Sequence, residues 1–322
     1  MAVLVYAESW NGSFKKATYE AVSYAAQLAN KLGTEAIALT IANSDDAAQL
    51  GNYGASKVLV LTNDSLNTFN NQAYANAIVA AAENAGADTI VISNTNKGKS
   101  VAPIVAAKRE AGLITNVLEL PSSTSPFTVK RKTFSSKAFA NYSTNAAQKV
   151  ISITPNAQEV VATGGSTTVE SFDYTATESD NRLSSVSIDR ATGKVSLTEA
   201  ELVVSAGRGL KGPENWGMIE ELADVLGAAT ACSKPVADIG WRPHGEHVGQ
   251  TGIAINPELY IAIGISGAIQ HLAGVNSSKN IVVINTDPEA PFFKAADYGI
   301  VGDAFEEVPK LIDALKVYKA NN

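Results

Sequence analysis

Short apolar runs alternate with longer stretches of helical periodicity over the first 120 residues of the chain. The apolar runs predict strands at 3–7, 35–41, 57–61, 89–93 and 114–120. The stretches between them place small and apolar side chains on one face at helical spacing, at 13–32, 71–85 and 100–111. Strands separated by helices are typical of a parallel sheet with helices on its faces, so an α/β fold is predicted.

The texture changes between residues 121 and 190, where Ser, Thr and Asn dominate. Period-2 stretches at 127–133 and 150–153 predict antiparallel strands, added to the first domain together with surface loops. The segment 163–168 (Thr-Gly-Gly-Ser-Thr-Thr) is predicted to be one of these loops.

Alternation of strands and helices resumes near residue 194 and continues to the end of the chain. Strands are predicted at 202–205, 260–263, 281–285 and 298–301, and a closing helix is predicted at 303–319. A length of 322 residues suits two domains. We therefore expect an N-terminal parallel α/β domain with the added antiparallel region at 1–193, a smaller parallel α/β domain at 194–322, and a hinge near Gly193.

Charge and composition exclude several classes of protein. A net charge of −7 argues against a general grip on nucleic acid, and the basic cluster at 130–132 is expected to be a solvated edge. No apolar run approaches the roughly 18–20 residues of a membrane span. The N-terminus shows no leader, so the chain is expected to work in the cytoplasm. The single cysteine, Cys232, excludes an intrachain disulfide and is expected to be a buried, inert thiol.

A glycine-rich loop follows the strand predicted at 202–205. Gly207, Gly209 and Gly212 match the fingerprint in which a tight turn lets backbone N–H groups approach a pyrophosphate. A nicotinamide site would need an acidic residue about 20 residues further on, at the end of the next strand. No acid occurs in that zone before Asp238, so the fit to nicotinamide is poor. Glycines that serve only the turn remain an alternative.

A second loop, at 264–268 (Gly-Ile-Ser-Gly-Ala), follows the strand predicted at 260–263 and precedes a predicted helix. It loosely matches a nucleophile elbow with Ser266 as the nucleophile. That assignment needs an acid and then a histidine downstream, but His271 is only five residues on and no histidine follows Asp287. The triad cannot be assembled in that order. What remains is a helix N-terminus whose N–H groups and hydroxyl suit an anion or a carbonyl group.

Histidines offer few other sites. His244 and His247 have a spacing that some metal ligands share, but Pro243 and the glycine between them predict a loop, and a third ligand is missing. No metal site is therefore expected. His271 falls in the first turns of the helix predicted to begin at Ser266. Its side chain could pack in the core or bind a ligand, and the sequence leaves both alternatives.

Polar residues also follow the last two predicted strands. Asn285 and Asp303 stand at the carboxyl ends of these strands, which is the edge where open parallel sheets bind ligands. Asp303 is also suited to cap the last helix, and the two roles are compatible. Together with the two glycine loops, these positions predict a nucleotide-binding edge.

Several runs of the C-terminal third form a combined sequence pattern. They are 207–211, 248–252 (Val-Gly-Gln-Thr-Gly), 257–274, 287–291 (Asp-Pro-Glu-Ala-Pro) and 296–303. The longest of them reads Pro-Glu-Leu-Tyr-Ile-Ala-Ile-Gly-Ile-Ser-Gly-Ala-Ile-Gln-His-Leu-Ala-Gly. These runs closely resemble the signature of electron transfer flavoprotein alpha subunits. The resemblance covers about residues 200–318 and is looser over 1–190, where 50–55 and 111–117 still fit.

The resemblance implies a heterodimer with a smaller beta subunit and one FAD, held mainly by the C-terminal domain. Arg208 would meet the cofactor near its phosphates, and Asn285 and Asp303 would hold its adenosine end. The other cofactor-binding residues that the resemblance implies are Ser233, Lys234, Val248, Gly249, Gln250, Thr251, Ser266, Gly267, Ala268, Ile269, Gln270 and His271.

The resemblance also implies roles for some of these side chains. Reduction of a flavin places negative charge on the N1–C2=O side of the ring, where the helix N-terminus and a protonated or donating His271 would receive it. The Thr251 hydroxyl would hydrogen-bond N5. No base or nucleophile is required, since the redox chemistry belongs to the cofactor. The family usually has arginine at the position of Lys234, which keeps the positive charge but lacks the planar guanidinium.

Partners follow from the same resemblance. Electrons would arrive from acyl-CoA or related dehydrogenases, as in fatty acid beta-oxidation, and leave to a membrane-associated quinone oxidoreductase. The C-terminal domain would swing about the hinge to face these partners. Two alternatives remain: a nicotinamide- or nucleotide-dependent oxidoreductase that uses the loop at 207–212, and a noncatalytic nucleotide-binding regulatory module.

Overall fold

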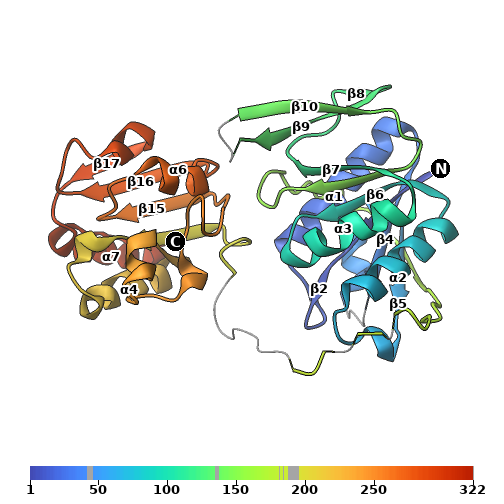
Figure 1. The fold of residues 1–322 in the computed structure, drawn as a ribbon, viewed down its shortest axis with the longest axis horizontal. Coiled ribbons are helices and arrows are strands. Elements are labelled where there is room, and N and C mark those ends of the chain that lie inside the picture. Colours follow the sequence, from blue (N-terminus) through green and yellow to red (C-terminus); the bar gives the residue numbers. More distant parts are fainter. Residues whose placement is uncertain (42–45, 135–137, 181, 184, 188–195, 322) are drawn as a thin grey trace. The chain divides into compact units, whose positions relative to one another are not determined.

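The computed structural model describes residues 1–41, 46–134, 138–180, 182–183, 185–187 and 196–321. The chain forms two compact units, 1–132 with 139–190 and 133–138 with 191–322. Each unit is an α/β structure with a mostly parallel sheet, which confirms the predicted fold class (Figure 1). The boundary predicted between residues 193 and 194 and the hinge near Gly193 lie outside the described residues.

The sheet of the first unit runs in the order β10-β9-β7-β11-β6-β1-β4-β5-β12, and β8 pairs with β9. Neighbours from β7 to β12 in this order are parallel, whereas β9 is antiparallel to β7 and β8. Its strands are β1 (Ala2–Tyr6), β4 (Glu35–Ile41), β5 (Lys57–Leu61), β6 (Ala87–Ser93), β7 (Gly112–Val117), β8 (Ser123–Thr124), β9 (Phe127–Thr133), β10 (Ala138–Thr144), β11 (Lys149–Ile153) and β12 (Thr168–Ser171). A short hairpin pairs β2 (Ser9–Trp10) with β3 (Ser13–Phe14).

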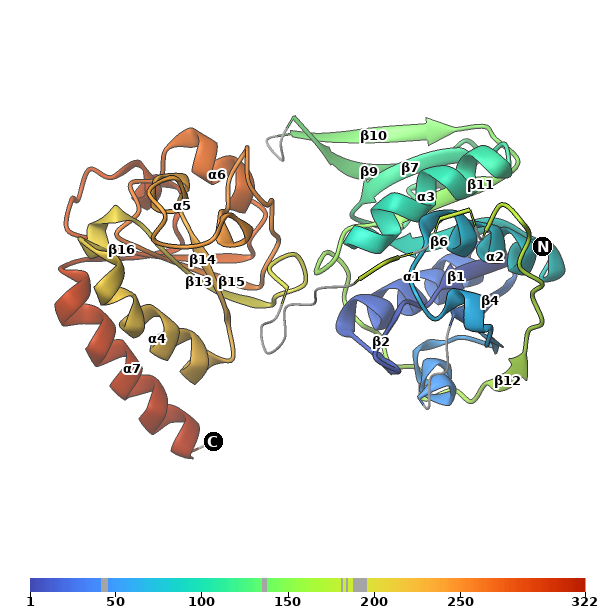
Figure 2. The ribbon, with the colours of Figure 1, turned by 60° about the horizontal axis from the view of Figure 1, so that its bottom comes forward.

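Helices cover both faces of this sheet, which explains why its central strands are rich in buried apolar residues (Figures 1 and 2). Leu4 and Tyr6 of β1 enter one core cluster and Val3 and Val5 the other, because successive side chains of a strand point to opposite faces. The first cluster includes α2 and α3, and the second includes α1. The helical segments are α1 (Lys16–Leu32), α2 (Asn71–Asn84), α3 (Asn96–Lys108) and the 3₁₀ turns η1 (Ala47–Tyr53) and η2 (Asp64–Leu66).

The region from 121 to 190 differs from its prediction. The strand predicted at 127–133 is antiparallel as expected, but β11, predicted at 150–153, is parallel to both β6 and β7 and lies between them. The antiparallel assignment of β11 was therefore wrong. Its Val150 and Ile151 enter opposite core clusters, so both of its faces are buried, as in a central parallel strand.

Two other features of this region depart from the sequence analysis. The polar, exposed strand β12 was not predicted and pairs in parallel with β5 at the edge of the sheet. The basic cluster at 130–132 lies on β9 and is not simply a solvated edge. Lys130 pairs with Glu119 at 2.8 Å, and burial lowers the pKa of Lys132 to about 8.

The sheet of the second unit is parallel throughout and runs in the order β14-β13-β15-β16-β17. Its strands are β13 (Leu202–Ala206), β14 (Ala229–Cys232), β15 (Leu259–Ile263), β16 (Asn280–Asn285) and β17 (Tyr298–Val301). Its helical segments are η3 (Arg208–Leu210), η4 (Pro213–Trp216), α4 (Gly217–Leu226), α5 (Lys234–Asp238), η5 (His244–Glu246), α6 (Ile269–Val275), η6 (Pro291–Ala295) and α7 (Ala304–Asn321). The strand β14 was not among the predicted strands, since Ala-Thr-Ala-Cys is short and only weakly apolar.

The connections of this sheet reverse direction between β13 and β15. The helices α4 and α7 lie side by side and share one core cluster, whereas α6 packs against the cluster on the opposite face (Figures 1 and 2). In open α/β sheets the loops at such a reversal diverge to opposite faces and leave a crevice beyond the carboxyl ends of the strands. The second unit therefore has its ligand edge where β13 and β15 end.

Candidate functional site

The loops after β13 and β15 meet backbone to backbone at this edge. The Gly207 N–H donates to the carbonyl of Ile263 at 2.9 Å, and the Gly209 N–H donates to the carbonyl of Gly264 at 3.1 Å. A Cβ atom on Gly207 would lie 2.3 Å from the Gly264 oxygen, and one on Gly209 would lie 2.6 Å from the Gly264 Cα. Gly207 and Gly209 thus allow the close approach of two loops, a packing role that the sequence did not predict.

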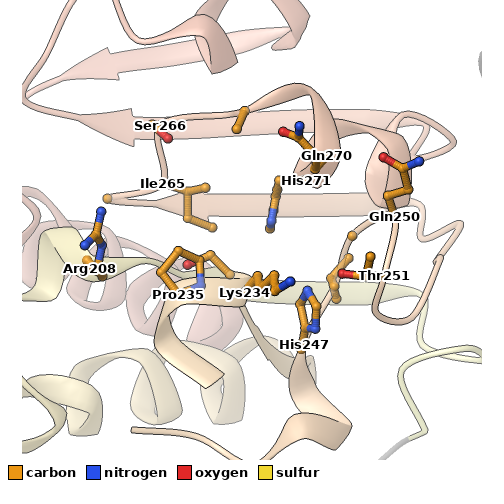
Figure 3. A pocket seen from close by; sticks show the side chains of 15 residues that line it. Arg208, Lys234, Pro235, His247, Gln250, Thr251, Ile265, Ser266, Gln270 and His271 are labelled. Atoms are coloured by element: carbon orange, nitrogen blue, oxygen red, sulfur yellow. The ribbon is translucent and has the colours of Figure 1, made fainter. Parts of the chain in front are cut away.

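A pocket with a volume of about 360 Å³ opens beside these loops, within the range of small-molecule sites. Residues from the loops that follow β13, β14 and β15 line it together with residues of α6 (Figure 3). In Figure 3, Arg208 lies at one end of the pocket, Gln250 and Thr251 at the other, and His271 between them. The lining residues are Arg208, Ser233, Lys234, Pro235, His247, Val248, Gly249, Gln250, Thr251, Gly264, Ile265, Ser266, Ala268, Gln270 and His271.

The charges of the lining suit an anionic ligand. Arg208 and Lys234 are exposed, and neither forms an ion pair within the described part of the chain. The lining residues, all of them described, include no carboxylate. The position after β14, where a nicotinamide site needs an acid, is held by Ser233 and Lys234. A nicotinamide ligand is therefore disfavoured.

His271 is the buried polar group of the pocket. Its Nε2 lies 2.8 Å from the Tyr260 hydroxyl, and its Nδ1 is buried with no partner in the described structure. Burial first, and the nearby His247 second, lower the pKa of His271 to about 4. The ring is therefore neutral at pH 7 in this structure, and the roles implied for His271 beside the flavin stay predictions.

The residues around the start of α6 differ from the expectation in one respect. The helix begins at Ile269 after Ala268, so Ser266 precedes it and does not open it. The Ser266 carbonyl instead accepts the N–H of Phe292 at 3.1 Å. Gly267, with φ of +81°, packs on Phe292, where a Cβ would lie 2.5 Å from its backbone nitrogen.

The segment from Val248 to Thr251 is held between β14 and α6. The Val248 N–H donates to the carbonyl of Cys232 at 3.0 Å, and the Gln250 N–H donates to the carbonyl of Gln270 at 2.7 Å. Cys232 itself is buried, as predicted, and burial raises the pKa of its thiol to about 12. This segment therefore has a fixed backbone beneath the exposed side chains of Gln250 and Thr251.

His247 is a pocket residue that the sequence analysis missed. Its spacing from His244 suggests only a metal ligand, whereas its position directly before Val248 is the sequence signal for a place in the pocket. His247 is buried. Burial, opposed by Asp238 and reinforced by Lys234, lowers its pKa. Pro235, Gly264 and Ile265 also line the pocket and were not among the implied cofactor contacts. Groups of three possible metal ligands are absent from the described residues.

Four implied contacts lie outside this pocket. Gly267 packs on Phe292, and Ile269 is exposed on α6. Asn285 donates to the carbonyl of Ile265 at 3.0 Å and so supports the loop after β15. Asp303 accepts the N–H of Phe305 at 2.9 Å and lies 3.6 Å from Lys211 Nζ, which places it at the start of α7.

Comparisons with known proteins match segments of both units. Residues 3–177 match the family model "Electron transfer flavoprotein domain", and residues 196–276 match "Electron transfer flavoprotein FAD-binding domain". FAD is therefore the cofactor of the second unit.

Proteins named electron transfer flavoprotein subunit alpha are similar along their full lengths. Identity is 37% with the protein of Syntrophomonas wolfei, over 97% of this chain and 98% of the relative. Identity is 36% with the protein of Bacillus subtilis, over 98% of this chain and 97% of the relative. With that of Pseudomonas aeruginosa it is 38%, over 98% and 100%. This chain belongs to the electron transfer flavoprotein family, among its alpha subunits.

Proposed function

We propose that this chain pairs with a beta subunit and carries electrons on an FAD, part of which lies in the pocket beside His271. One observation supports the placement: His271 lines a pocket whose free charges are cationic, and its buried Nδ1 has no partner in the described structure. Buried polar atoms normally have partners, so the Nδ1 of His271 fits a ligand with a hydrogen-bonding atom at that point. The bound FAD supplies the redox chemistry itself.

The residues of the chain bind and orient the cofactor and set its electrostatic surroundings. Arg208 and Lys234 oppose its negative charge from the rim of the pocket. The fixed backbone from Val248 to Thr251 presents the Thr251 hydroxyl and the Gln250 amide. Ser233, Ser266 and the α6 end of the pocket complete the cradle, and Asn285 and Asp303 hold the part of FAD beyond it.

The electron donors are acyl-CoA or related dehydrogenases and the acceptor is a quinone oxidoreductase. The described residues contain no helix of the length and apolarity that a membrane crossing requires. We place the carrier in the cytoplasm, and fractionation of the source cells tests that placement. Reduction of the purified complex by a dehydrogenase and its substrate, followed by reoxidation with a quinone oxidoreductase, tests the direction of flow.

Cofactor binding is tested by co-expression with a beta subunit, a visible spectrum and identification of the released nucleotide. We expect flavin absorption bands and FAD. A complex that stays colourless after incubation with excess FAD would overturn the proposal. Arg208→Gln should weaken FAD binding roughly 10- to 100-fold, since it removes a charge-assisted contact. Lys319→Gln on the exposed end of α7 is the matched control and should leave binding unchanged.

A further inference from the structure

Tyr260 is buried in the middle of β15 and faces the helix that carries His271. The phenol ring is fully buried. It stacks on Phe292 with ring centroids 6.2 Å apart, and the imidazole of His271 lies edge-on to Phe292 at 5.7 Å. The three rings therefore pack as one group, and the orientation of the imidazole is set by its two aromatic neighbours.

The hydrogen bond between Tyr260 and His271 also bears on where the imidazole carries its proton. The hydroxyl lies 2.8 Å from Nε2. Burial raises the pKa of Tyr260, and a side-chain hydrogen bond with Ser205 opposes that rise, so the phenol keeps its proton. A protonated phenol can donate to the ring nitrogen that lies beside it.

A neutral imidazole has one N–H and one bare nitrogen, and the bond made by one nitrogen selects the other as the donor. If Tyr260 donates to Nε2, the ring proton lies on Nδ1. This is the nitrogen that is buried without a partner. We propose that Tyr260 is a positioning residue that holds His271 in the Nδ1–H tautomer, so that the pocket offers a hydrogen-bond donor to an oxygen or nitrogen of its ligand. The identity of that ligand rests on the proposed function, but the tautomer does not.

The tautomer is measured on the two-chain complex without FAD, by nitrogen-15 NMR of histidine-labelled protein. With three histidines in the chain, His271→Gln assigns the signals. We expect a protonated Nδ1 and a bare Nε2 in the wild type, and a shift toward the opposite tautomer in Tyr260→Phe. A protonated Nε2 in the wild type overturns the proposal, even if the variant does not fold. An unchanged tautomer in a folded Tyr260→Phe overturns it as well.

Coupling between the two residues is measured through FAD binding. Tyr260→Phe should weaken binding roughly 3- to 10-fold, the value of one neutral hydrogen bond, and should add nothing in a protein that already carries His271→Gln. Tyr74→Phe is the matched control, because it removes a buried phenol that donates to the carbonyl of Leu66 at 2.8 Å in the other unit. If the losses of FAD-binding free energy from Tyr260→Phe and His271→Gln simply add in the double variant, the positioning role is contradicted. A wild type that binds no FAD defeats the proposed function, while the NMR result still decides the tautomer.

Discussion

Gly207 and Gly264 touch through their backbones at the point where β13 and β15 end. No side chain fits between them, since a Cβ on Gly207 would lie 2.3 Å from the Gly264 oxygen. Gly264 also has a φ of +60°, which side-chain-bearing residues adopt at a cost. The two loops that border the pocket are therefore a single packed unit.

This contact predicts that Gly207→Ala destabilises the second unit. The methyl group must push the loops apart, which costs about 1–3 kcal/mol for an overpacked site, and FAD binding should weaken with it. Thermal unfolding and FAD titration of the complex measure both effects. The control is Gly217→Ala, since a Cβ there meets nothing within 4 Å and lies in α4. It should be neutral or slightly stabilising. Equal behaviour of the two variants would refute the packing explanation.

Lys234→Arg should shift the midpoint potential of the flavin without abolishing FAD binding. Arginine keeps the charge and adds a planar group that can stack and donate two parallel hydrogen bonds. A change of about 1.4 kcal/mol in the relative affinity for the two oxidation states corresponds to roughly 30 mV for a two-electron couple. Potentiometry measures the shift, with Lys279→Arg as the control, because Lys279 directly precedes β16 at the end of the strand away from the pocket. Potentials of Lys234→Arg and wild type that agree within error would exclude a role for this position.

The neutral state of His271 predicts a pH dependence of stability. Its pKa is lowered to about 4 in the fold, against 6.5 when exposed. The unfolded chain therefore binds the proton first as the pH falls, so stability is complete above about pH 6.5 and is lost toward pH 4. At pH 5 the loss is about 2 kcal/mol. Melting of the FAD-free complex from pH 8 to 5 checks this, because the advantage of wild type over His271→Gln should shrink. A constant gap would rule out the shift.

Arg242 braces the turn that leads to His247. Its guanidinium makes two parallel bonds to Glu246, at 2.8 and 2.7 Å, and a third to Glu220 at 2.9 Å. Arg242→Ala leaves the mostly buried Glu246 carboxylate without this partner and should cost about 1–3 kcal/mol. Lys316→Ala, which removes an exposed pair with Glu221, should cost at most about 0.5 kcal/mol. Urea unfolding compares them, and similar losses would count against the brace.

Apolar periodicity predicted the strands that are buried on both faces. The bounds of β4 and β5 match the predicted ranges, because each is a mostly apolar run followed by polar residues. The bounds of β9 match as well, although that strand was predicted from period-2 alternation. The strands β12 and β14 were not predicted, since each has only four residues, mostly polar or small, and shows no apolar pattern. The parallel pairing of β11 depends on contacts with distant segments, which local pattern does not encode.

The candidate site shows the same division. Residues directly after predicted strands were expected to gather at one edge, and Arg208 and Ser266 line one pocket. Ser233 lines it too, but it follows the unpredicted strand β14 and was implied only by the family resemblance. The contact between Tyr260 and His271 depends on the packing of α6 against β15, and eleven residues of sequence separation do not reveal it. His247 was hidden because its neighbour His244 suggested metal ligation, whereas its burial comes from the tertiary fold.

The shared boundary of Gly207 and Gly264 also limits protein engineering. In a library that varies only the loop after β13, the turn at Gly264 stays as it is. Nearly all variants with a bulky residue at 207 or 209 should then fail to fold, before any selection for redox properties. Useful diversity therefore belongs at the exposed rim, at Lys234, Gln250 and Thr251, where side chains can vary without moving either turn.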